Sequence, residues 1–190
     1  MKLAIILAIL LILIGGCSTV QDLPSEPTIK TTHTILEIHE LVLNEQDLQQ
    51  LGIEGNETNC KTEEQTAFDL SMVQYSVCSY IISNLNDTQV IIELKKFTNS
   101  SELENAYQYE SSHLYSVEGL ISENDYGDQS RFRVSNEHDY GGQYNDPNVY
   151  YYHLWICKDL YLIHITSIGR SKEAVDYIAK IGRRILSKYE

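Results

Sequence analysis

The stretch that decides the fold class runs from residue 149 to residue 168 and reads VYYYHLWICKDLYLIHITSI. Its two β-rich runs, Val149–Cys157 and Leu160–Ile168, are separated only by Lys158 and Asp159. Aromatic and β-branched residues fill both runs, and so short a link between them favours an antiparallel β-hairpin.

With a two-residue turn at Lys158-Asp159, His153 lies opposite His164 and Cys157 lies opposite Leu160. Two imidazoles on one sheet face are candidate ligands for a transition metal. No third ligand and no CxxC or HxxxH spacing accompanies them, so the sequence predicts no metal site and no cofactor. The alternative role for both histidines is that of half-buried side chains under a helix or loop. The opposite face is expected to be core and carries Tyr150, Tyr152, Leu154, Ile156, Tyr161, Ile163 and Ile165.

Upstream of this hairpin, the period-two alternation of apolar residues predicts further strands. Gln74–Ile82 and Gln89–Phe97 form a second hairpin through the turn-rich link 83–87. The other expected strands are Thr34–Leu43, Val117–Ser122 and Arg131–Val134.

Helices are expected where the apolar spacing changes to that of an amphipathic helix. A short one covers Glu45–Leu51, with Asn44 as its N-cap. A second covers about 101–115, where Ser101 and Glu104 form a capping box and Leu103, Ala106, Tyr107, Ser111 and Leu114 share one face. A third covers about 171–188, with Ser171 as cap and an apolar stripe of Ala174, Val175, Ile178, Ile181, Ile185 and Leu186.

Together these elements predict an α+β fold, a single antiparallel β-sheet with the two amphipathic helices of about 101–115 and 171–188 packed on it. In its order of elements the chain is similar to the small export-associated α+β domains of the PsbP and Mog1 type. That resemblance rests on element order alone, so it assigns no site residues.

The N-terminus carries a targeting signal. One basic residue, Lys2, precedes twelve apolar residues from Leu3 to Ile14. As a helix this run rises about 18 Å, too little for a hydrocarbon core about 30 Å thick. It therefore reads as the apolar region of a secretory signal peptide.

The segment at the end of this run, Ile14-Gly15-Gly16-Cys17, resembles the lipobox of prokaryotic lipoproteins. The resemblance implies that the Cys17 thiol receives a diacylglyceryl group and that the chain is cut just before it. Residues 1–16 are then a signal peptide, 17–32 a lipidated tether with Pro24 and Pro27, and 33–190 a single ectodomain. The predicted location is the cell membrane, lipid-anchored and facing outside the cytoplasm. The alternatives are an ordinary signal peptide or an uncleaved anchor.

The excess of acidic residues argues against nucleic acid and anionic membrane surfaces as binding partners. The chain holds 14 basic and 27 acidic residues, a formal charge of −13, which becomes −14 once Lys2 is removed. No cluster of basic residues is present, so binding to nucleic acid is not expected. Anionic head groups should repel so acidic a domain, which favours a tethered position over one flat on the membrane.

Three cysteines, Cys60, Cys78 and Cys157, follow Cys17. Outside the cytoplasm one disulfide is expected among them. Cys60–Cys78 is the first choice, because it pins a polar segment to a strand. Cys78–Cys157 is the second, and three buried thiols are the remaining alternative.

Three N-x-[ST] sequons, at Asn56, Asn86 and Asn99, make these residues candidates for glycosylation. All three are expected in loops or at the boundary of an element.

Tyrosine is unusually frequent, with fourteen residues in the chain. The long polar segment Ser135–Asn148 contains Tyr140 and Tyr144 beside Asp139 and Asp146. Such loops make good recognition surfaces, so this segment is the candidate binding loop. The alternative is a solvated connection. The acidic residues at 125, 128, 139 and 146 match no EF-hand spacing.

No GxSxG, HExxH or P-loop signature occurs in the chain. The leading hypothesis is therefore a non-enzymatic lipoprotein that binds a protein, a small molecule or an envelope component. The second hypothesis is a metal-dependent enzyme or metal-binding protein that uses the face of His153 and His164.

Overall fold

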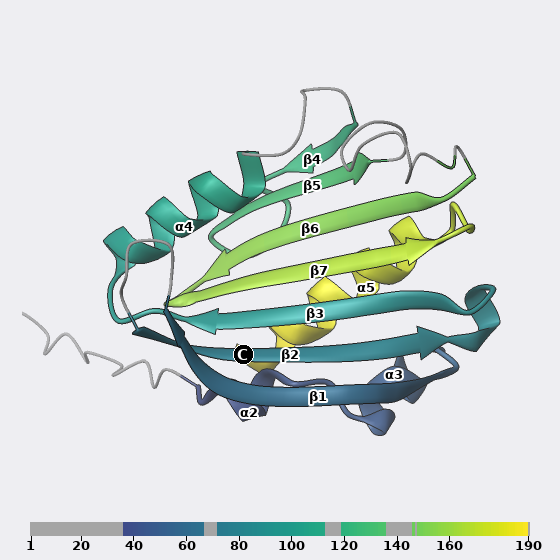
Figure 1. The fold of residues 1–190 in the computed structure, drawn as a ribbon, viewed down its shortest axis with the longest axis horizontal. Helices are drawn as coiled ribbons and strands as arrows, with labels where there is room; N and C mark the ends of the chain where they lie inside the picture. The colour runs from purple at the N-terminus through teal and green to yellow at the C-terminus, as the bar shows by residue number, and fades with distance from the viewer. Residues whose placement is uncertain (1–35, 67–71, 113–118, 136–145, 147, 190) are drawn as a thin grey trace, which may run out of the picture. The chain divides into compact units, whose positions relative to one another are not determined.

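One antiparallel sheet of seven strands forms the centre of the fold, in the order β1-β2-β3-β7-β6-β5-β4 (Figure 1). The computed structural model describes residues 36–66, 72–112, 119–135, 146 and 148–189, all in the second of two units, 1–34 and 35–190. The strands are β1 (Gly55–Thr66), β2 (Met72–Ile82), β3 (Thr88–Lys96), β4 (Leu120–Glu123), β5 (Gln129–Ser135), β6 (Tyr150–Lys158) and β7 (Tyr161–Gly169). The predicted α+β class with a single antiparallel sheet is confirmed.

Helices precede, interrupt and follow the sheet. They are α2 (Ile38–Leu41), α3 (Glu45–Gln50), α4 (Ser100–Ser112) and α5 (Ala174–Leu186), with short 3₁₀ turns η1 (Ser83–Leu85) and η2 (Ser187–Tyr189). As predicted, Asn44 caps α3, since its side chain accepts a hydrogen bond from the Asp47 backbone N–H. In the described part of the chain, no helix is both long enough and apolar enough to span a bilayer.

The predicted strand at Thr34–Leu43 is wrong, because residues 38–41 form helix α2. Glu37 and Glu40 make a capping box, which starts a helix at this point. Ile38 and Leu41 are both buried, and residues three apart share a face only in a helix. The apolar residues of this segment fit both the two-residue period of a strand and the 3.6-residue period of a helix, and their burial in the folded protein favours the helix.

Strand β1 was not predicted, because its twelve residues are almost entirely polar. It is an edge strand held by antiparallel pairing with β2, with a register shift between Glu57 and Asn59. Edge strands need no apolar face of their own when one neighbour holds them.

The disulfide joins these two strands. Cys60 lies directly opposite Cys78, with Cα atoms 4.1 Å apart, and the bond closes a separation of 18 residues. The first-choice pairing is confirmed. The Cys78–Cys157 alternative is wrong, because Cys157 is a free, buried thiol on β6.

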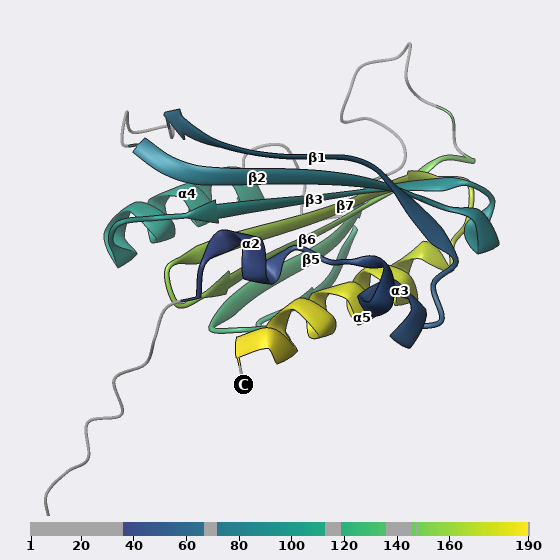
Figure 2. The same cartoon turned by 90° about the horizontal axis from the view of Figure 1, so that it is seen from below.

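Alternate strand residues divide the core into two clusters. One contains Leu154, Ile156, Ile163 and Ile165 together with Ile178, Ile181 and Ile185 of α5 and with residues of α2 and α3. Figure 2 shows α2, α3 and α5 along the same side of the sheet. The other cluster contains Trp155, Cys157 and Leu162 together with Leu103, Ala106 and Tyr107 of α4. We call the sheet face of Trp155 the α4 face.

The start of α4 differs from the prediction. Asn99, and not Ser101, is its cap, because the Asn99 Oδ1 accepts a hydrogen bond of 3.0 Å from the Glu102 backbone N–H. The buried face of α4 carries Leu103, Ala106, Tyr107 and Ser111, as the spacing predicted. Leu114 lies outside the described residues.

Candidate functional site

The last hairpin has a register different from the predicted one. Its turn is at Asp159-Leu160, since Lys158 pairs with Tyr161. Asp128 explains the shift, because its carboxylate accepts hydrogen bonds of 3.0 Å from both the Lys158 Nζ and the Asp159 backbone N–H. Asp159 then turns through a left-handed conformation with φ of 54°.

This shift moves the histidines without separating them. His153 pairs with Thr166 and His164 pairs with Trp155, so the predicted direct opposition of the two histidines is wrong. A shift of two positions leaves every side chain on its original face. His153 and His164 are therefore diagonal neighbours on the α4 face, and the His153 Nδ1 lies 3.2 Å from the His164 Nε2.

The pair is part of a chain of hydrogen bonds across four strands. The Tyr75 hydroxyl on β2 donates to the Glu93 Oε1 on β3 at 2.6 Å, and the Glu93 Oε2 lies 2.9 Å from the His164 Nδ1. The Thr166 Oγ1 lies 3.1 Å from the His164 Nε2 and 3.3 Å from the His153 Nδ1. Tyr75, Glu93 and Thr166 were not predicted from the sequence, although a lone carboxylate inside the apolar strand β3 was a visible signal.

Burial and charge determine the protonation states in this network. The His153 side chain is only 2% exposed, and this burial, with the charge of His164, lowers the pKa of His153 to about 3. Burial acts to raise the pKa of Glu93, but the hydrogen bonds from His164 and Tyr75 outweigh it and lower that pKa to about 2. Burial and the bond to Glu93 raise the pKa of Tyr75. At neutral pH, His153 is neutral and Glu93 is ionised.

The ring geometry is that of a hydrogen-bonded pair and not of a chelate. The ring centroids are 5.4 Å apart and the ring planes differ by 19°. The two facing nitrogens are 3.2 Å apart, and the rest of the centroid separation is about the sum of the two centroid-to-nitrogen distances. The nitrogens therefore lie on the line between the centroids, and the two rings lie end to end in nearly one plane. Each ring nitrogen then points at the other, whereas a zinc ion needs both lone pairs to converge on a point about 2.0–2.1 Å away. Among the described residues, no group of three or more His, Cys, Asp or Glu side chains is placed to hold a metal.

Trp155 covers both imidazoles. Its ring is nearly parallel to those of His164 and His153, at angles of 8° and 12°, with centroids 4.6 Å and 5.3 Å away. On the neighbouring strand β5, Arg133 pairs with His153 and Arg131 pairs with Trp155. The polar network thus lies beside Trp155, which belongs to the buried cluster that also contains Leu103, Ala106 and Tyr107 of α4.

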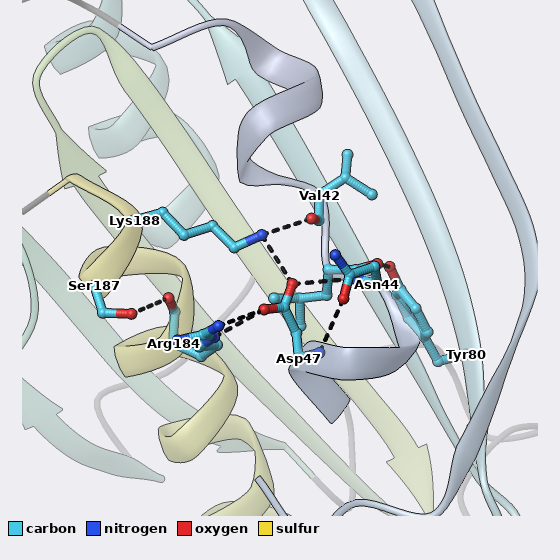
Figure 3. Close-up of polar contacts among 8 residues, drawn as sticks. Val42, Asn44, Asp47, Tyr80, Arg184, Ser187 and Lys188 are labelled. Atoms are coloured by element: carbon cyan, nitrogen blue, oxygen red, sulfur yellow. Dashed lines mark hydrogen bonds and ion pairs between the residues drawn. The ribbon is translucent and has the colours of Figure 1, made fainter. Parts of the chain in front are cut away.

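A second buried polar cluster joins α3 to the C-terminal end of α5 (Figure 3). Residues of both helices belong to the core cluster that lies on the other face of the sheet from Trp155. Asp47 of α3 is 3% exposed and binds Arg184 of α5 at 2.7 Å and Lys188 of η2 at 2.9 Å. Lys188 also donates to the Val42 carbonyl oxygen at 2.8 Å, and the Tyr80 hydroxyl donates to the Leu43 carbonyl oxygen at 3.0 Å. Burial acts to raise the pKa of Asp47, but the hydrogen bonds from Lys188, from the Asn44 backbone N–H and from Arg184 outweigh it and lower that pKa. The cluster joins the first helices to the last one.

Only one of the four predicted binding-loop residues lies within the described part. Tyr140, Tyr144 and Asp139 lie outside it. Asp146 forms an ion pair of 2.7 Å with Arg170, and its carboxylate accepts from the Asn148 backbone N–H at 2.9 Å. The bonds to Asn148, ahead of the pair with Arg170, lower the pKa of Asp146.

The sequon asparagines are all exposed. Asn86 follows η1 in a left-handed turn, and Asn99 caps α4. Asn56 is the second residue of the edge strand β1 and so lies at the boundary of an element. Glycosylation of the three stays a prediction.

Cys157 offers no nucleophile. Burial raises the pKa of its thiol to about 12, so the thiolate is not populated near neutral pH.

Comparison with family models, curated proteins and solved structures gives no match.

Proposed function

We propose that this chain is a lipid-anchored extracytoplasmic protein whose domain binds a partner, a ligand or an envelope component and has no catalytic role of its own. The observation that carries the proposal is the sequence Ile14-Gly15-Gly16-Cys17, in which Ile14 is the last of twelve consecutive apolar residues. Cys17 is the lipid attachment point, residues 1–16 are removed, and 17–32 tether the domain 33–190.

The proposed platform is a sheet on which the two predicted amphipathic helices, now α4 and α5, pack. Shared clusters of buried side chains support this packing, since α5 contributes to one and α4 to the other. An added Cβ at Gly182 would lie 2.9 Å from the Leu154 Cδ2, so α5 approaches β6 closely.

The proposed recognition element is the tyrosine-containing loop at 135–149. Its described ends are held by the fold, which supports the idea of a loop presented from a rigid base. Ser135 pairs with Tyr151, the Val149 backbone N–H donates to the Asp146 carbonyl oxygen at 2.9 Å, and Asp146 binds Arg170.

The anchor is tested by expressing the full chain in a prokaryotic host supplied with a clickable fatty acid. The expected result is a labelled, membrane-bound protein, with label and membrane association both lost in Cys17→Ser. Cys157→Ala is the matched control, because it removes the other cysteine that forms no disulfide and should keep the label. Unchanged, detergent-extractable mature protein in Cys17→Ser would refute the anchor.

The loop is tested separately, with a photocrosslinking residue in place of Tyr140 or Tyr144 in the membranes of the native host. One adduct of defined mass is expected from both positions. The control is the same residue in place of Tyr109, which is 38% exposed on α4. An equal adduct from Tyr109, or none from the loop, would contradict the binding role of the loop. A stoichiometric metal that is bound by the full chain and lost in His153→Ala would instead favour the metal hypothesis.

A further inference from the structure

The His153–His164 contact has room for one hydrogen atom. Two ring nitrogens 3.2 Å apart and pointing at each other need one N–H and one lone pair between them. Two lone pairs, or two N–H groups, would repel at this distance. The number of protons on the pair therefore determines which ring donates.

The neutral pair has one favoured arrangement. Glu93 is an acceptor, so the His164 Nδ1 carries a hydrogen and its Nε2 is a lone pair. His153 must then carry its hydrogen on Nδ1 and donate it to the His164 Nε2. The Thr166 hydroxyl, within 3.3 Å of both nitrogens, can rotate to fit either direction.

One added proton reverses this bond. A proton that enters at the His153 Nε2, with transfer of the Nδ1 proton to the His164 Nε2, leaves His164 as an imidazolium beside ionised Glu93. His153 is again neutral, but it now carries its hydrogen on Nε2. A second proton would set two N–H groups against each other and break the bond.

We propose that the His153–His164 pair is a proton switch, in which the first proton reverses the bond and changes the tautomer of His153, and the second opens the pair. The lowered pKa of His153, caused by burial and by His164, agrees with resistance to the second proton. The proposal does not depend on the lipid anchor or on the binding loop.

Other charged groups share this face and act on the same titration. Strand pairing and side-chain contacts place on it Lys61 and Glu63 of β1, Tyr75 of β2, Glu93 and Lys95 of β3, Glu123 of β4, Arg131 and Arg133 of β5, Tyr151 of β6, and Glu104, Tyr107 and Glu110 of α4. Of these, Glu93 is in direct contact with the pair, since its Oε2 lies 2.9 Å from the His164 Nδ1.

Trp155 is a built-in reporter, because it is the single tryptophan of the chain and its ring lies 4.6 Å from His164. A protonated imidazole quenches a neighbouring indole. In the full chain in detergent, Trp155 emission, excited where tyrosine does not absorb, should fall in one step on acidification from about pH 8 to about pH 4. His164→Gln should abolish the step, and His39→Gln, at an exposed site on α2, should keep it.

Nitrogen NMR of the wild-type imidazoles supplies a test that needs no variant. Over the same scan, His153 should change from the Nδ1–H to the Nε2–H tautomer while His164 becomes an imidazolium. A His153 tautomer that stays constant would overturn the proposal, even if Trp155 emission changes. An emission step that persists in folded His164→Gln would overturn it as well.

Discussion

Asp47 and Arg184 are 137 positions apart in the sequence, and two hydrogen bonds of 2.9 Å and 2.7 Å join the Asp47 Oδ1 to the Arg184 guanidinium (Figure 3). The contact attaches helix α3 to helix α5. Lys188 binds the other carboxylate oxygen at 2.9 Å, so one buried anion holds two cations. The N-terminal helices are thereby held to the C-terminal end of the fold.

Asp47→Ala should therefore lower the free energy of unfolding by about 2–3 kcal/mol, because two cations lose their anion and α3 loses a capping partner. Urea unfolding of the full chain measures the change. Glu123→Gln is the control, since Glu123 is exposed and its ion pair with Arg131 should contribute less than about 1 kcal/mol. Equal effects of the two variants would contradict a special role for Asp47.

Loss of the disulfide should lower the free energy of unfolding by about 3 kcal/mol, because the bond constrains the unfolded chain over an 18-residue separation. The measurement compares oxidised and reduced protein in denaturant. Reduction should destabilise Cys157→Ala but leave the double variant Cys60→Ser/Cys78→Ser unchanged. Two free thiols at Cys60 and Cys78 in the unreduced protein would show that the pairing is wrong.

Acid should destabilise the domain through two groups of the α4-face network. His153 has a folded pKa of about 3, below the ordinary value of 6.5, so the unfolded chain binds an additional proton between these values and stability falls with pH. Glu93, with a folded pKa of about 2 against 4.5, contributes stability above 4.5 that is lost between 4.5 and 2. Both effects have the same sign, and stability should decline from about pH 6.5 downward.

The variants His153→Phe and Glu93→Gln separate the two pH ranges in which stability is lost. Thermal unfolding as a function of pH should lose its slope between about pH 6.5 and pH 3 in the first and below about pH 4.5 in the second. His39→Gln should retain the wild-type curve. An undiminished slope in His153→Phe would exclude His153 as its source.

Two glycines with similar backbone conformations should respond differently to alanine. Gly127, at φ of 59°, would place its Cβ against the Cys157 carbonyl oxygen, whereas Gly52, at φ of 68°, has nothing within 4 Å of the added atom. Gly52→Ala should cost about 1 kcal/mol for the left-handed backbone alone. Gly127→Ala should cost at least about 2 kcal/mol more, since a backbone atom must move. Similar unfolding midpoints for the two variants would contradict this account of the β4–β5 turn.

Some elements and residues could be predicted from the sequence and others could not. The 3.6 and 2.0 periodicities identified α4, α5 and both hairpins, because those segments bury one regular face. They failed at Thr34–Leu43, where the apolar residues fitted both periods, and at β1, where no apolar face exists. The disulfide was predictable because few pairings were available. Glu93, Tyr75 and Asp47 were missed, because their roles depend on partners from distant parts of the chain.

The sequence by itself determined the fold class and the charge and limited the disulfide to a few pairings, since composition and local spacing are properties of the linear chain. Only the tertiary structure decided the register of the last hairpin. Asp128, thirty positions before Lys158, sets that turn, and a two-residue shift preserves the pattern of faces that a sequence can reveal. The meeting of His153 with His164, and of both with Trp155, follows from that register and from side-chain orientation.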